Sequence, residues 1–100
     1  MTNKKLSKEL DKLLMALSKI GVNTKVTAEM SGVSIHSLSN WRQGKSSPNQ
    51  SNLIKLRDYS LSLLSIHGLQ SEVRECAASF FREAEITLRD MPRIGEKEEK

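Results

Sequence analysis

Residues 21–56 read GVNTKVTAEMSGVSIHSLSNWRQGKSSPNQSNLIKL and contain the pattern that decides the fold. A short helix is expected over 24–31, where Asn23 is a good N-cap, and a second over about 35–43, where Ser34 is a plausible N-cap. Gly32 lies between them and tolerates the positive φ that a tight turn needs. The stretch therefore predicts two helices joined by a turn of three or four residues.

Side-chain size and spacing indicate how these two helices pack. Ala28 lies four residues before Gly32, and a small side chain is needed where two steeply crossing helices approach most closely. Leu38 and Trp41 are spaced i, i+3, so they share the face of the second helix that docks on the first. The opposite face remains available for binding.

Three longer helices are expected around this unit, over about 4–20, 51–66 and 70–90. Apolar residues recur at helical spacing in each, and no alternating strand pattern is present. Gly21, Gly44 and Gly68 fall where apolar stretches stop, and Pro48 marks 44–50 as a loop. The pattern predicts an all-α fold of five helices.

Composition excludes several functional classes. A chain of 100 residues fits one domain, and no apolar run reaches the roughly 20 residues of a membrane helix. The lone Cys76 excludes a disulfide framework, and no metal, cofactor or catalytic residue is expected because no suitable ligand or nucleophile–base cluster occurs. We expect a cytoplasmic protein that is not an enzyme.

Charge is distributed unevenly along the chain. The net charge is +4, but residues 1–50 hold eight basic and three acidic residues while 51–100 hold eight and nine. A basic half beside a nearly neutral one suggests a surface for a polyanion, although small domains are often mildly basic.

The segments AEMSGVS (28–34), NWRQGK (40–45), Pro48 and LIKL (53–56) together resemble the helix-turn-helix of the lambda-repressor/Cro-like (XRE) family of regulators. The resemblance covers roughly residues 6–57. It implies a lambda-repressor-like domain whose third helix enters the DNA major groove, dimers on palindromic operators, and an origin in a bacterium, phage or plasmid. We divide the chain into a DNA-binding unit (1–66), a C-terminal helix (67–90) and a charged flexible tail (91–100).

Three positions depart from the family pattern. Thr27 replaces a large aliphatic residue, so either Val26 and Met30 supply the missing packing or Thr27 bonds back to a backbone carbonyl. Thr24 replaces a glutamine that often holds a phosphate. Arg42 replaces an acidic residue, which is expected to make the DNA side more basic.

The outward face of the second helix supplies the candidate base-reading residues Ile35, His36, Ser39 and Asn40. Asn40 can pair with adenine, His36 can donate to guanine, and Ile35 can contact a thymine methyl. Alternatives are a buried core position for Ile35, a solvated imidazole for His36 and a mere spacer role for Ser39. Trp41 is expected in the packing face, not in base stacking.

Candidate phosphate-binding residues flank this helix: Asn23, Thr24, Ser37, Arg42, Gln43 and Lys45. Asn23 and Thr24 stand at a helix N-terminus, where N–H groups attract anions. Such contacts set register and affinity without reading bases. Lys4, Lys5 and Lys8 form either a DNA-contacting arm or a frayed basic terminus.

The last expected helix carries an apolar stripe that must be buried against another part of the protein or a second subunit. We expect Val73, Ala77, Phe80, Phe81, Ala84 and Leu88 to form a homodimer interface, the alternative being packing on the chain's own domain. The function expected is a sequence-specific double-stranded DNA-binding transcriptional regulator, a repressor. The alternative is an antitoxin or partner-binding module that binds its operator and holds a protein partner through this helix.

Overall fold

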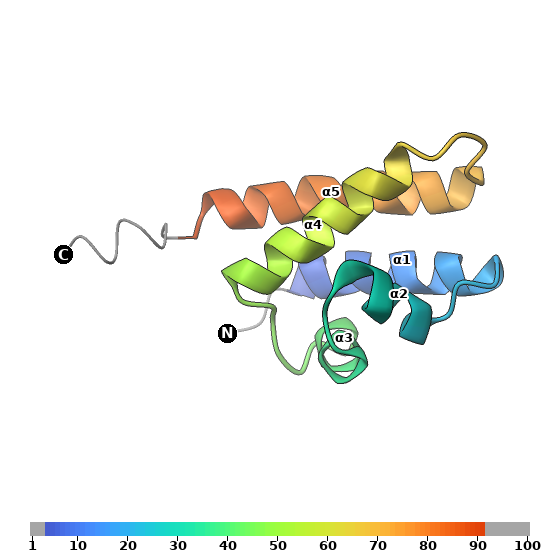
Figure 1. Ribbon diagram of the computed structural model, residues 1–100. Helices are drawn as coiled ribbons and strands as arrows, with labels where there is room; N and C mark the ends of the chain where they lie inside the picture. The colour runs from blue at the N-terminus through green and yellow to red at the C-terminus, as the bar shows by residue number, and fades with distance from the viewer. Residues whose placement is uncertain (1–3, 92–100) are drawn as a thin grey trace.

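Five α-helices make up the computed structural model, which describes residues 4–91 and has no strand among them (Figure 1). They are α1 (Lys4–Lys19), α2 (Thr24–Ser31), α3 (Ile35–Arg42), α4 (Gln50–Leu64) and α5 (Ser71–Arg89). The predicted all-α class is confirmed, and each predicted helix end lies within two residues of the observed one. The predicted tail lies outside the described residues except for Met91.

The chain from α2 to α3 is held by local hydrogen bonds. The Asn23 side chain accepts from the backbone N–H of Val26 at 2.9 Å, and the Ser34 hydroxyl accepts from the N–H of Ser37 at 3.0 Å, so both predicted N-caps are confirmed. Gly32 ends α2 with φ of 84° and donates its N–H to the Ala28 carbonyl at 3.0 Å. A residue with a Cβ atom would be strained at this φ. Gly32 therefore sets the direction in which α3 leaves α2.

One apolar core draws on all five helices. α1 contributes a row of buried leucines, α3 contributes Leu38 and Trp41, and α4 adds Leu53 and Leu56. The expectation that Trp41 belongs to the packing face is confirmed, since it is buried. Burying each such leucine stabilises the fold by about 1.5–3 kcal/mol.

The apolar stripe of α5 is also part of this core. Val73, Ala77, Phe80 and Ala84 are all at most 1% exposed in the single chain, and α5 packs against α1 and α4. This corrects the expected dimer interface, because side chains buried in their own domain are not accessible to a second subunit. The amphipathic pattern is the same for a helix buried within a domain and one buried between subunits. Phe81 and Leu88, the other two predicted interface residues, are half-buried.

The arrangement leaves α3 at one side of the molecule. α3 contacts α1 and α2, whereas α5 contacts α1 and α4, so α1 lies between α3 and α5 (Figure 1). No helix within residues 4–91 is long and apolar enough to cross a membrane.

Candidate nucleic-acid interface

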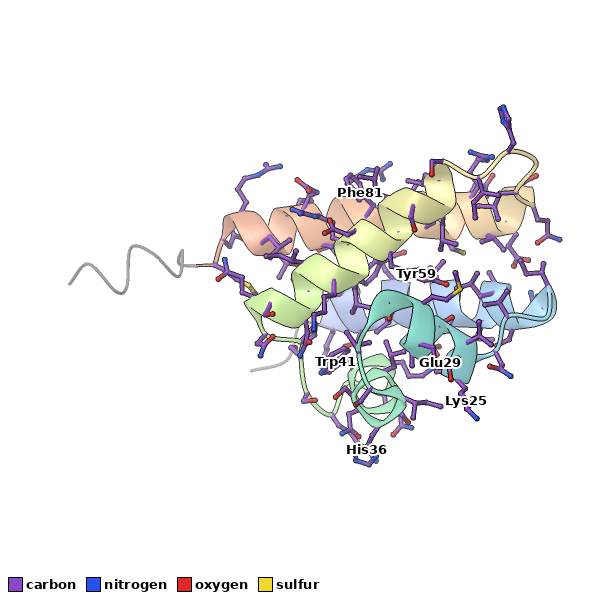
Figure 2. The ribbon with its side chains drawn as sticks, viewed as in Figure 1. Lys25, Glu29, His36, Trp41, Tyr59 and Phe81 are labelled. Carbon is purple, nitrogen blue, oxygen red and sulfur yellow. The ribbon has the colours of Figure 1, made fainter. Side chains whose placement is uncertain are left out.

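The first turn of α3 presents its side chains to solvent. Ile35 is 48% exposed and His36 is exposed, and Figure 2 shows His36 at the outer edge of the molecule. A buried core position for Ile35 is therefore wrong. Ile35 and His36 follow directly on the Ser34 cap, which fixes the backbone from which they project. An exposed isoleucine beside an imidazole places apolar and hydrogen-bonding groups on the same projecting turn.

The second turn of α3 places Ser39 and Asn40 at half-buried positions. The Asn40 side chain makes no hydrogen bond to any other described side chain, while its backbone carbonyl accepts from the N–H of Lys45 at 2.9 Å. The Ser39 hydroxyl accepts from the side-chain amide of Gln43 at 3.2 Å and retains its own proton for donation. Both residues keep donors that a ligand can use.

The N-terminus of α2 carries the first two candidate phosphate contacts. Asn23 is exposed, and capping uses its carbonyl oxygen, which leaves the amide NH₂ available. The Thr24 hydroxyl is half-buried and accepts from an Arg42 guanidinium nitrogen at 3.3 Å. The helix N-terminus and the Asn23 amide therefore remain open to an anion, while Thr24 is engaged within the fold.

Arg42 is held inside the domain. Its Nε donates to Asp11 Oδ1 at 2.7 Å, and only 23% of its side chain is exposed. The expectation that Arg42 makes the DNA side more basic needs correction, because Asp11 on α1 compensates this charge. Through Asp11 and Thr24, Arg42 joins α1, α2 and α3 at one point.

The remaining candidate phosphate contacts lie at the two ends of α3. Ser37 accepts from the Ser34 hydroxyl at 2.9 Å, and its own proton is available to a phosphate. Gln43 and Lys45 are exposed after the helix ends. The Lys45 ammonium has no ion pair with any other residue of 4–91, so it is the uncompensated cation of the predicted set.

Other cations lie near α3: Lys4 and Lys8, which belong to the expected DNA-contacting arm, and Lys25, which was not predicted. Lys4 and Lys8 line a hollow of about 400 Å³ that Asp11, Arg42 and Gly44 also border. Lys25 lies on the same side of the molecule as His36 in Figure 2. The four-residue spacing of Lys4 and Lys8 was visible in the sequence, but the contact of α1 with the end of α3 was not.

One of the two expectations for Thr27 is wrong. Thr27 is 1% exposed, yet its hydroxyl has no hydrogen-bond partner within the described chain, so it does not bond back to a carbonyl. Of the two residues expected to supply the missing packing, Met30 is 66% exposed and supplies little, whereas Val26 is half-buried. The fold accommodates the threonine and leaves its hydroxyl buried and unsatisfied.

Within residues 4–91, no three potential metal ligands lie close enough together to hold an ion. Comparison of the chain with family models, with curated proteins and with solved structures finds no match.

Proposed function

We propose that the protein is a sequence-specific double-stranded DNA-binding transcriptional regulator, a repressor that inserts α3 into the major groove of a palindromic operator as a homodimer. The observation that carries the proposal is the division of α3 into two faces. Leu38 and Trp41 are buried, while the side chains of Ile35, His36 and Asn40 lie on the remaining surface and form no hydrogen bond or ion pair with another side chain of residues 4–91. A half-exposed isoleucine beside two uncommitted polar groups suits the mixed chemistry of base edges.

Each of these side chains has a specific role in base reading. His36 donates to the N7 or O6 acceptor of guanine, and Asn40 forms a bidentate pair with N6 and N7 of adenine. Ile35 packs on a thymine methyl. Residues near the N-terminus of a recognition helix reach furthest into the groove, and Ile35 and His36 occupy the first turn of α3.

Phosphate contacts position α3 in the groove. The N–H groups and Asn23 amide at the start of α2 bind one backbone phosphate, and Lys45 binds another beyond the end of α3. Ser37 and Gln43 add neutral donors between them. The partly buried ion pair of Arg42 contributes by orienting α3, since its charge is already compensated by Asp11.

The test is binding of the full chain to duplex DNA from the region upstream of its own coding sequence, followed by fluorescence anisotropy. We expect binding that survives competitor DNA and is lost on a scrambled duplex. The logarithm of affinity falls with the logarithm of salt by about 0.9 per phosphate neutralised. Equal, weak binding to both duplexes would show that α3 does not read that sequence.

A further inference from the structure

The hollow of about 400 Å³ beside Lys4 and Lys8 lies between the first half of α1 and the end of α3 (Figure 1). Its α1 side is one face of that helix, because the residues that line it are three and four positions apart: Lys4, Ser7, Lys8 and Asp11. Arg42 borders it from α3. The volume of this α1–α3 hollow is within the range of small-molecule sites in proteins.

The charges that border the α1–α3 hollow are mainly positive. Lys4 and Lys8 form no ion pair with any other residue of 4–91. Arg42 and Asp11 pair with each other, so their charges compensate. Two lysine charges therefore remain uncompensated beside the hollow, and they favour an anionic occupant.

The start of α1 adds to this positive potential. The N-terminal end of a helix carries a partial positive charge, for which acidic side chains in the first turn commonly compensate. The first turn of α1 contains no acidic residue and begins with Lys4 and Lys5. An anion in the hollow therefore interacts favourably with the helix end as well as with the lysine side chains.

Ser7 supplies an unpartnered hydroxyl at the buried side of the hollow. The residue is 9% exposed and lines the hollow, yet its side chain forms no hydrogen bond with any other residue of 4–91. A buried polar side chain normally has a partner in the protein or in a bound molecule. The hydroxyl proton is available to an oxygen atom of an occupant.

Arg42 also keeps donors that the fold does not use. Its Nε donates to Asp11 and its Nη1 donates to Thr24, whereas its Nη2 forms no hydrogen bond within residues 4–91. Ammonium, hydroxyl and guanidinium donors therefore border one small hollow. A phosphate group, with several negatively charged oxygens, suits this set of donors.

We infer that the α1–α3 hollow binds the phosphate group of a small molecule. Lys4 and Lys8 compensate its charge, and Ser7 donates a hydrogen bond to one of its oxygens. A backbone phosphate of DNA has the same chemistry, but Ser7 is 9% exposed, which favours a small molecule over a large duplex. The bound phosphate lies beside the Asp11–Arg42 pair that orients α3, so its binding is expected to lower affinity for DNA. Only this last effect rests on the proposed function.

The first experiment titrates the full chain with inorganic phosphate and follows the backbone amides by NMR, with sodium chloride at matched ionic strength as the reference. We expect saturable shifts around Lys4, Ser7 and Lys8 that chloride does not produce. Ser7→Ala should raise the dissociation constant for phosphate about tenfold at unchanged net charge. The variant should fold as the wild type does, because the hydroxyl has no partner within residues 4–91. No saturable response of the wild type, or equal binding by folded Ser7→Ala, would overturn the inference.

Two lysine variants separate the hollow from a general effect of positive charge. Lys8→Gln removes a charge that borders the hollow. Lys12→Gln removes the same charge one turn later on α1, at an exposed position that does not line the hollow. We expect Lys8→Gln to weaken phosphate binding about tenfold and Lys12→Gln to bind nearly as the wild type does. Equal losses for the two variants would reject a site at the hollow.

A DNA-binding assay separates a small molecule from the DNA backbone as the source of the phosphate. In phosphate-free buffer, Lys8→Gln should bind duplex DNA with the same slope of log affinity against log salt as the wild type. A slope reduced by about 1 would show that Lys8 contacts a backbone phosphate, and would overturn the small-molecule source.

The same assay keeps this inference distinct from the proposed function. Phosphate binding by a chain that does not distinguish cognate from scrambled duplex would reject the proposed function and leave the phosphate site intact. A chain that distinguishes the duplexes but does not bind phosphate would do the reverse. In a chain that does both, phosphate at constant ionic strength should lower the DNA affinity of the wild type more than that of Ser7→Ala. Equal effects would show that the hollow does not act on α3.

Discussion

Asp11 on α1 and Arg42 at the end of α3 form a hydrogen-bonded ion pair, with 2.7 Å between Oδ1 and Nε. The same guanidinium donates to Thr24 on α2 at 3.3 Å. One side chain therefore connects the three helices that surround the candidate DNA surface. We interpret Arg42 as the residue that fixes the orientation of α3, and Lys45 as the cation that remains available to phosphate.

Replacing Arg42 with alanine should therefore lower stability as well as DNA affinity. We expect the free energy of unfolding to fall by about 1 kcal/mol. The expected loss is modest because Asp11 is partly exposed, so solvent screens the ion pair. Urea denaturation followed by circular dichroism measures this change.

Lys45→Ala is the matched control for Arg42→Ala. It should leave the free energy of unfolding unchanged and reduce the slope of log affinity against log salt by about 1, the effect of one phosphate contact. If Arg42→Ala instead reduced the slope with no loss of stability, Arg42 would be a direct phosphate ligand and the orienting role would be rejected.

Thr27→Val should stabilise the protein. The Thr27 hydroxyl is buried without a hydrogen-bond partner in the described chain, and a methyl group of similar shape removes the cost of its desolvation. We expect the free energy of unfolding to rise by about 1 kcal/mol. Thr24→Val is the comparison, because that hydroxyl has a partner and its loss should be neutral or destabilising. A Thr27→Val protein less stable than the wild type would show that the hydroxyl is satisfied.

Cys76 should react slowly with alkylating reagents in the folded protein. Burial against the core raises the pKa of its thiol, and the neighbouring Glu72 carboxylate raises it further. Less thiolate is then present at a given pH, so the curve of alkylation rate against pH should lie at higher pH for the folded chain than for the urea-unfolded chain. Because the folded-state pKa is the higher one, the fold also loses a small stabilisation as pH rises through that range. Coincident curves for the folded and the unfolded chain would mean that folding does not change the pKa of the Cys76 thiol.

The sequence predicted the helices well because local residues specify their ends. Asn23, Ser34 and Gly32 each form a hydrogen bond to a residue only three or four positions away in the sequence, and the structure contains all three bonds. The burial of Leu38 and Trp41 likewise followed from their i, i+3 spacing.

Contacts between distant segments could not be predicted in the same way. Asp11 and Arg42 are 31 residues apart, so nothing in the spacing of α3 indicated that Arg42 was already paired. The stripe around Phe80 showed that α5 must be covered, but helical periodicity does not distinguish α1 and α4 of the same chain from a second subunit.

The most direct measurement is selection of binding sites from a random duplex library with the full-length chain, followed by anisotropy titration of the enriched duplex. We predict one enriched sequence, with half-sites about 10 bp apart, and a loss of about 1–3 kcal/mol with relaxed base preference for Asn40→Ala or His36→Ala. As a control, the Ser65→Ala variant, substituted at an exposed position just beyond the end of α4, should bind the enriched duplex as the wild type does. No enrichment, or equal losses on enriched and scrambled duplexes, would contradict a base-reading role for α3.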